Sequence, residues 1–241
     1  MIKLWKIPVI RVLLVVLLAF LTFQASVLLK QAITPILPES IASDSNSMGA
    51  IFKTILALIS IFIIAIIPGK DLKSFGFCLP KRLNYLKLVG ITFVVTLGSI
   101  FLLAPLYMVF LSNVFHVKMS GGFNLGSSIW VMIIGVWFWS SITEEIFNRG
   151  LVQSLLQDLS HLRFLGLSLP VWMSAILFGA GHLTVFKISG SPFFVMLIVS
   201  NATLMGLVAA RYREKSGSIV PAIIVHILAN IFGSLPSLFL N

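Results

Sequence analysis

Three ionisable residues stand close together inside an apolar segment of the chain. The stretch SSITEEIFNRG places Glu144, Glu145 and Arg149 directly after the run IWVMIIGVWFW. Each charge near the centre of a bilayer costs about 2.5–3.5 kcal/mol on insertion scales, so charges in apolar helices usually have a function. A carboxylate in such surroundings can take a proton from water, and general-base catalysis is the first chemistry to consider.

The spacing of these residues separates one ion pair from one remaining carboxylate. Glu145 and Arg149 are four residues apart, so on a helix they share a face and can pair. Glu144 is rotated by about 100° from its neighbour, because an α-helix has 3.6 residues per turn. It therefore needs another partner or a proton. Two adjacent carboxylates in a low dielectric are expected to differ in proton affinity.

Two further apolar segments carry polar side chains four residues apart. FGAGH contains Phe178 and His182, and HILAN contains His226 and Asn230. Small residues, which allow helices to approach closely, surround both motifs: Gly179, Ala180, Gly181, Ala222 and Ala229.

These groups suit amide hydrolysis in a buried site. A carboxylate such as Glu144 can activate water, His182 can orient that water, and His226 with Asn230 can donate to a developing oxyanion. Such a donor is worth about 2.7–4 kcal/mol in known hydrolases. Taken singly, each histidine, the asparagine or the ion pair has a structural interpretation as interhelical packing. Their joint occurrence on three apolar segments indicates a site.

The composition defines the elements that must position these residues. The chain has 241 residues, of which 59% are hydrophobic and only 10% are charged, whereas soluble domains carry roughly 25% charged residues. It is therefore expected to be an integral membrane protein with one compact helical domain. The single cysteine, Cys78, excludes an internal disulfide and a cysteine-based metal cluster.

The apolar runs predict an all-α bundle of about seven transmembrane helices, because each run is about long enough to cross a bilayer. The predicted spans are residues 12–29, 50–67, 88–111, 129–156, 169–186, 193–210 and 219–235. The first run is interpreted as a span and not as a removed signal peptide, because it is about 18 residues long and has no convincing cleavage site.

The basic residues predict the orientation of the bundle. The net charge of +10 comes from short connections between apolar runs and not from a patch with interleaved aromatic residues, so no nucleic-acid partner is expected. The basic connections fall on one side if all seven runs cross: Lys3, Lys6 and Arg11, then Lys70, Lys73, Lys81, Arg82 and Lys87, then RYREK. The N-terminus is therefore predicted inside and the C-terminus outside.

The three motifs, taken in order, carry a resemblance to a known family. EEIFNR fits EExxxR, FGAGH fits FxxxH, and HILAN fits HxxxN. With these motifs the sequence resembles the CAAX protease and bacteriocin-processing family, also called the Abi family, of intramembrane endopeptidases. The resemblance covers roughly residues 129–235. One departure is FNRG, where Asn148 follows the aromatic residue, but the Glu145–Arg149 spacing is preserved.

The resemblance implies a role for the first motif. Glu144 would be the carboxylate that activates water, with Glu145 and Arg149 as its structural and electrostatic support. Both a metal-dependent and a metal-independent mechanism are argued for the family. Two histidines and two glutamates suit zinc, but HExxH is absent and Arg149 would oppose a cation. We therefore expect a glutamate-type peptidase without metal or other cofactor.

The resemblance also implies roles for the other two motifs. His182 would contact the attacking water, and His226 with Asn230 would stabilise the oxyanion. Residues 129–241 would form the catalytic core, and residues 1–128 would supply transmembrane helices without an assigned motif.

The expected substrate is a peptide or protein associated with the lipid bilayer. The short chain looks like a bacterial member of the family, in the cell membrane with several spans, acting on a substrate that is not prenylated. One alternative is a non-catalytic bacteriocin-immunity or scaffold protein of the same fold that binds a membrane protein partner. Another is a proton-coupled transporter using Glu144 and His182 as a relay, although the paired repeats typical of transporters are not evident.

Overall fold

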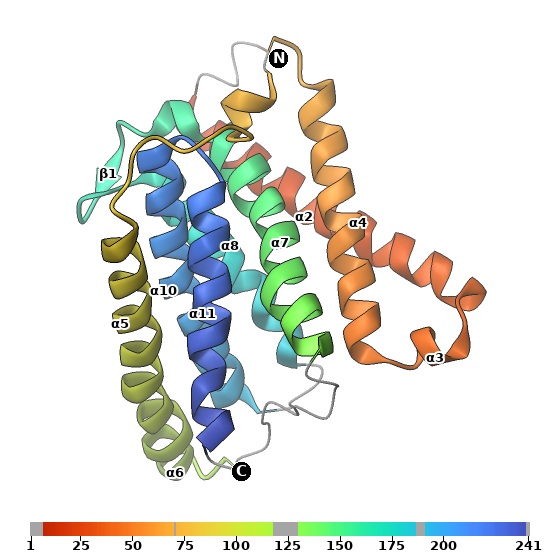
Figure 1. The fold of residues 1–241 in the computed structure, drawn as a ribbon, viewed down its shortest axis with the longest axis vertical. Helices are drawn as coiled ribbons and strands as arrows, with labels where there is room; N and C mark the ends of the chain where they lie inside the picture. The colour runs from red at the N-terminus through yellow and green to blue at the C-terminus, as the bar shows by residue number, and fades with distance from the viewer. Residues whose placement is uncertain (1–6, 70, 118–129, 187–190, 240–241) are drawn as a thin grey trace.

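The fold is a bundle of helices that run alternately between two ends of the molecule (Figure 1). The computed structural model describes residues 7–69, 71–117, 130–186 and 191–239. The α-helices are α2 Pro8–Ile33, α3 Glu39–Ala42, α4 Ser45–Ile66, α5 Tyr85–Ala104, α6 Ser112–Val114, α7 Ser141–Glu145, α8 Leu169–Gly181, α10 Pro192–Ser216 and α11 Val220–Phe239. The predicted all-α class is confirmed.

Several elements depart from regular α-helix. Stretches with π-helical hydrogen bonding lie at Pro105–Leu111, Val131–Ser140 and Ile146–Gln153. Short 3-10 turns lie at Thr34–Ile36, Leu72–Phe75, Gln157–Leu159 and His182–Val185. Strands β1 Arg163–Phe164 and β2 Leu167–Ser168 form one antiparallel hairpin that pairs Arg163 with Ser168.

Side-chain caps and prolines mark where the helices begin. Asp44 accepts a hydrogen bond from the N–H of Ser47 at 2.7 Å at the start of α4. Asn84 caps α5 in the same way. These bonds satisfy backbone donors that have no partner within the helix. At the C-terminal end of α10, Gly217 has φ +73°, a left-handed conformation that favours glycine.

Among the described residues, four helical segments are long and apolar enough to cross a membrane. They are Pro8–Ile36, Ser45–Ile66, Tyr85–Val114 and Pro192–Ser216. Leu169–Val185 and Val220–Leu235 are shorter apolar helices. Many large apolar side chains are exposed along the bundle, such as Leu102 at 74%, as expected of surfaces that face lipid. The chain is a helical membrane protein, and the number of seven spans remains a prediction.

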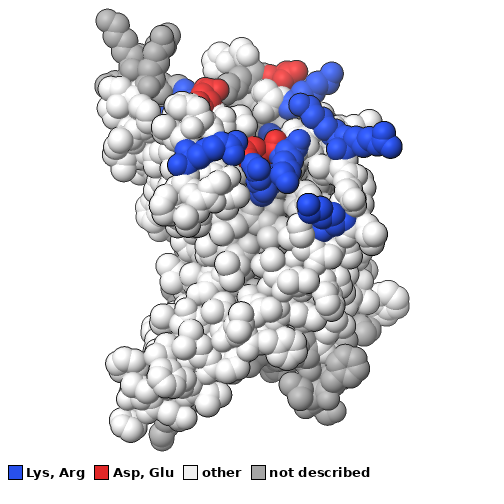
Figure 2. Space-filling view, turned by 90° about the vertical axis from the view of Figure 1, so that its left-hand side faces the viewer, with Lys and Arg blue, Asp and Glu red and all other residues white. Residues whose placement is uncertain are grey.

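Most of the described Lys and Arg residues on the face drawn in Figure 2 gather toward one end of the bundle. Figure 2 shows the Lys and Arg side chains of one face in its upper part, above a large uncharged surface. The α4–α5 and α10–α11 connections lie at this end in Figure 1, and we call it the basic end. Lys3, Lys6, Lys70 and the polar connection 119–128 lie outside the described residues. The inside–outside orientation therefore remains a prediction.

The connection between α4 and α5 is docked on the α10–α11 turn. Lys81 N–H donates to the carbonyl of Ser216 at 3.0 Å, and Ile219 N–H donates to the carbonyl of Gly76 at 3.0 Å. Ser218 Oγ donates to the carbonyl of Cys78 at 2.5 Å. These bonds fix the N-terminal half of the chain to the C-terminal half at the basic end.

Helices α8 and α10 pack closely because glycines lie where they cross. A Cβ atom added at Gly179 would lie 2.0 Å from Thr203 Oγ1 and 3.0 Å from the carbonyl oxygen of Val199. A Cβ atom at Gly206 would lie 3.1 Å from the Cα of Ala175. The prediction that small residues allow close helix approach is confirmed at Gly179.

Candidate active site

One helix carries the first motif through the middle of the bundle. It consists of the π-helical stretch Val131–Ser140, the α-helix α7 and the π-helical stretch Ile146–Gln153, and we call residues 131–153 the central helix. Its C-terminal part is buried, including Asn148, Arg149, Gly150, Leu151, Val152 and Gln153. Figure 1 shows this helix, around the label α7, between α4 and α11.

Glu145 is the centre of a fully buried ion-pair network. Its Oε1 atom lies 2.9 Å from Nη1 of Arg149, the pair predicted from the spacing, and 3.0 Å from Nδ1 of His226. The side chains of Glu145 and Arg149 are 1% and 0% exposed. A buried charge pair needs such further hydrogen bonds to offset its desolvation. Glu145 therefore holds Arg149 and orients the ring of His226.

Arg149 ties this network to the neighbouring helices α8 and α10. Its Nη2 atom donates to the carbonyl of Gly206 at 2.9 Å, and its guanidinium lies 4.7 Å from the ring centroid of Phe178. One turn further on, Gln153 Nε2 donates to the carbonyl of Ala210 at 2.9 Å. Two side-chain hydrogen bonds thus join the central helix to α10, and they lie one turn apart on each helix.

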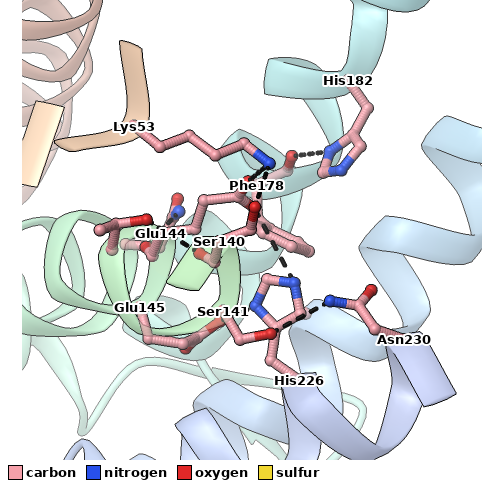
Figure 3. Close-up of polar contacts among 12 residues, drawn as sticks. Lys53, Ser140, Ser141, Glu144, Glu145, Phe178, His182, His226 and Asn230 are labelled. Carbon is pink, nitrogen blue, oxygen red and sulfur yellow. Dashed lines mark hydrogen bonds and ion pairs between the residues drawn. The ribbon is translucent and has the colours of Figure 1, made fainter. Parts of the chain in front are cut away.

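Glu144 faces a different neighbour, α4. Its Oε1 atom lies 2.7 Å from Nζ of Lys53, which also donates to Oγ of Ser140 at 2.8 Å (Figure 3). Its Oε2 atom lies 3.9 Å from Nε2 of His226. The Glu144 side chain is 13% exposed. The sequence left this carboxylate without a partner, and the structure supplies one from the N-terminal half of the chain.

His182 lies at the end of α8, beside the same group of side chains. Its Nδ1 atom is 2.9 Å from the carbonyl oxygen of Phe178. Because a carbonyl can only accept, Nδ1 carries the proton and Nε2 is the atom that can meet a water. The Phe178 ring makes edge contacts with the rings of both His182 and His226, with centroids 5.0 and 5.2 Å apart. Phe178 therefore positions both histidines.

Asn230 is hydrogen-bonded to the central helix. Its Nδ2 atom donates to the Oγ of Ser141 at 3.1 Å and to the carbonyl of Val136 at 3.2 Å. Both amide hydrogens are used in this arrangement. Asn230 must release one of these bonds before it can donate to an oxyanion.

Asn148, the departure from the family pattern, supports the backbone beside Glu144. Its Nδ2 atom donates to the backbone carbonyl of Glu144 at 2.8 Å. The backbone carbonyl of Asn148 accepts a hydrogen bond from Oγ of Ser174 at 3.1 Å. The extra bond falls where the helix changes from α to π hydrogen bonding. Asn148 therefore stabilises the backbone that carries Glu144.

Three residues of the site were missed from the sequence. Lys53 is not among the residues that the sequence predicts for the site, yet its ammonium contacts Glu144. Ser140 and Ser141 were part of the quoted stretch but were given no role. The available signal was a lone lysine inside the apolar run AIFKTILALIS.

The arrangement combines a partly exposed carboxylate with cations and hydrogen-bond donors around it. Glu144 has a lysine on one side and a histidine on the other, and Glu145 holds that histidine from behind. Glu145 orients the His226 ring that lies beside Glu144. The two glutamates therefore have distinct functions. This is the geometry expected of a base with an oriented neighbour.

Comparison with known proteins covers the C-terminal half of the chain. Residues 126–232 match the family model described as Type II CAAX prenyl endopeptidase Rce1-like. The match contains all three motifs and confirms the resemblance found from them. Lys53 lies outside it. No curated protein and no solved structure matches the chain.

Proposed function

Because residues 126–232 belong to the family of CAAX-type membrane proteases, we propose that the protein is an intramembrane endopeptidase in which Glu144 activates the attacking water. The observation that carries the proposal is the contrast between the two glutamates. Glu145 is fully buried between Arg149 and His226, whereas Glu144 is partly exposed. Of the two glutamates, only Glu144 is accessible to a water and a substrate.

The attacking water would lie between Glu144 and His182. Glu144 would take a proton from the water as oxygen attacks the peptide carbonyl carbon, and His182 Nε2 would accept a hydrogen bond from that water. The proton held by Glu144 would then pass to the leaving amine as the C–N bond breaks. A positioned general base and acid of this kind is worth typically 10²–10⁴-fold in rate.

The oxyanion would be stabilised by His226 and Asn230. The Nδ1–H of His226 donates to Glu145, so Nε2 needs a second proton to become a donor. The ring would then lie between the carboxylates of Glu145 and Glu144. Asn230 would turn one N–H from Val136 toward the oxyanion while keeping its bond to Ser141.

The proposed mechanism uses no metal ion. Both carboxylates already contact cations, Glu144 with Lys53 and Glu145 with Arg149. The Nδ1 atom of His226 is engaged by Glu145. Within the described part of the chain, no three His, Cys, Asp or Glu side chains are grouped as metal ligands. These residues fit a metal-independent site better than a zinc site.

The proposed substrate is a peptide or protein that lies in or on the bilayer. The site is built from side chains of four helices, α4, the central helix, α8 and α11, which belong to the membrane-embedded bundle. We propose a location in a cell membrane, with a bacterial membrane as the first setting to test.

The test is cleavage of a library of membrane-associated peptides by purified protein in liposomes. Wild type is compared with Glu144→Gln and His226→Ala, each with and without a chelator. Cleavage by wild type, a loss of at least about 10²-fold in both variants and no effect of the chelator support the proposal. Glu39→Gln and His161→Ala, which change exposed residues, serve as matched controls and should cleave like wild type.

Two outcomes would contradict the proposal. Cleavage that survives Glu144→Gln would exclude Glu144 as the base, and cleavage that the chelator abolishes would exclude the metal-free mechanism. If wild type cleaves no peptide and both variants still support the cellular phenotype of the protein, the non-catalytic immunity or scaffold function is the correct one.

A further inference from the structure

A cleft leads from one end of the bundle to Lys53 and Ser140. It has a volume of about 380 Å³ and lies between the first turns of α4 and the first turns of the central helix. Its lining includes Ser45, Gly49, Ala50 and Lys53 on one side and Gly135 and Ser140 on the other. In Figure 1 these helix starts lie at the lower end, opposite the basic end.

The inner end of the cleft belongs to the candidate active site. Lys53 and Ser140 line the cleft, and they also contact each other. Lys53 in turn contacts Glu144. A molecule that fills the cleft therefore reaches the residues that surround the proposed base.

The walls of the cleft suit an extended peptide. Gly49, Ala50 and Gly135 have little or no side chain, so the backbone of a ligand can lie close to both helices. Ser45 and Ser47 at the start of α4 add hydroxyl groups, which can exchange hydrogen bonds with peptide groups. The cleft is continuous with the site, so its natural occupant is the segment of substrate next to the scissile bond.

Lys53 gives the cleft its charge. Among the described residues that line the cleft, it is the one charged side chain. Its ammonium has three N–H donors, and contacts with Glu144 and Ser140 account for two of them. Its side chain is 28% exposed, so it can meet a ligand in the cleft.

We propose that the cleft binds a substrate segment that carries a carboxylate, and that Lys53 is the specificity-determining residue that pairs with it. The inference rests on the proposed function for the identity of the occupant. A substrate carboxylate would take over the ammonium from Glu144. Glu144 would then be released from its ion pair at the moment the substrate is in place, and would be available to the water.

The carboxylate could come from an acidic side chain or from the end of a peptide. Both sources present the same chemistry to Lys53, so the experiment separates them. Three fluorescent peptides of one apolar sequence would be used: one with Asp and an amidated end, one with Asn and an amidated end, and one with Asn and a free carboxyl end.

Binding is measured by fluorescence anisotropy with the full chain in nanodiscs. The background is His182→Ala, which prevents turnover and leaves the Lys53–Glu144 contact in place. We expect at least one carboxylate peptide to bind about tenfold more tightly than the neutral peptide, which corresponds to about 1.4 kcal/mol. Whichever carboxylate peptide is preferred identifies the source.

Substitutions of Lys53 then test its part in this preference. Lys53→Met should reduce the preference to less than about twofold, and Lys53→Arg should retain most of it, because the charge is kept. Lys73→Met removes an exposed lysine at the basic end and should leave the preference unchanged. Lys53→Arg also shows whether a loss in Lys53→Met reflects charge or misfolding.

Three results would overturn the inference. They are equal binding of all three peptides, a preference that survives Lys53→Met, and no binding of either carboxylate peptide at about 1 mM. The cleavage assay is a separate readout. Cleavage without a carboxylate preference rejects only this inference, and a Lys53-dependent preference without cleavage rejects only the peptidase.

Discussion

The two faces of the central helix differ in a way that separates structural support from chemistry. On the face toward α10 and α11, Glu145 and Arg149 are fully buried and bonded to each other, to His226 and to the carbonyl of Gly206. On the face toward α4, Glu144 contacts Lys53, a partly exposed lysine that lines a cleft. Glu144 and Glu145 thus have different roles, because their surroundings differ.

The largest expected effect comes from removing the charge on the buried face. Glu145→Gln leaves Arg149 charged and buried without its counter-ion, and breaking such a pair costs about 3–5 kcal/mol. Glu144→Gln leaves Lys53 free to turn toward the cleft, so the free energy of unfolding should fall by no more than about 1 kcal/mol. Unfolding by SDS titration in mixed micelles measures both values.

A matched variant strengthens this comparison. Glu39→Gln changes an exposed carboxylate on α3 and should leave the free energy of unfolding as it is in wild type. Equal losses in Glu144→Gln and Glu145→Gln would show that the two faces do not differ energetically.

The second prediction concerns the close packing of α8 against α10. In Gly179→Ala the new Cβ would overlap Oγ1 of Thr203, and overpacking of this kind costs about 1–3 kcal/mol. A Cβ at Gly181, two residues further along α8, meets nothing within 4 Å. Gly181→Ala should therefore change stability by less than about 0.5 kcal/mol.

Thermal unfolding in detergent measures this difference. The pair of variants compares two glycines near the C-terminal end of one helix, and only Gly179 lies against α10. Similar melting temperatures for the two variants would contradict the close packing of α8 against α10.

The smallest predicted effect lies at the start of the cleft. Hydrogen bonds from Ser47, first its side chain and then its N–H, hold the pKa of Asp44 below its ordinary value of 3.8. The ionised Asp44 side chain therefore stabilises the first turn of α4 at pH values above the ordinary pKa of an Asp carboxyl. This contribution is lost as the pH falls through the lowered pKa of the folded chain.

Hydrogen exchange of the Ser47 amide tests this prediction. Its protection should decrease as the pH falls below about 4, the ordinary range of an Asp carboxyl. In Asp44→Asn the capping oxygen no longer titrates, so protection should not change with pH in that range. A pH-dependent loss of protection that is the same in both proteins would argue against the cap.

Local features of the site were predictable from the sequence. The Glu145–Arg149 pair followed from a spacing of four residues, and the three motifs followed from polar residues within apolar runs. Long-range contacts were not predictable in this way. The bond between His226 and Glu145 joins residues 81 positions apart, and no helical period encodes it.

The fold was predictable to a similar extent. Apolar runs located the helices, because burial in a bilayer requires length and hydrophobicity. The partner of Glu144 was missed, because Lys53 lies on α4 and the whole of α5 separates it from Glu144 in the sequence. The π-helical hydrogen bonding of the central helix was also missed, since 3.6-residue periodicity assumes a regular α-helix.

The π-helical stretches on both sides of α7 bear on how the chain can change in length. Each turn in such a stretch holds about one residue more than an α-helical turn, because its hydrogen bonds span five residues and not four. Loss of one residue from Val131–Ser140 or Ile146–Gln153 could restore regular hydrogen bonding at that place alone. A deletion within Val131–Ser140 would lie before both glutamates and keep the four-residue spacing of Glu145 and Arg149, whereas a deletion between Glu145 and Arg149 would shorten it.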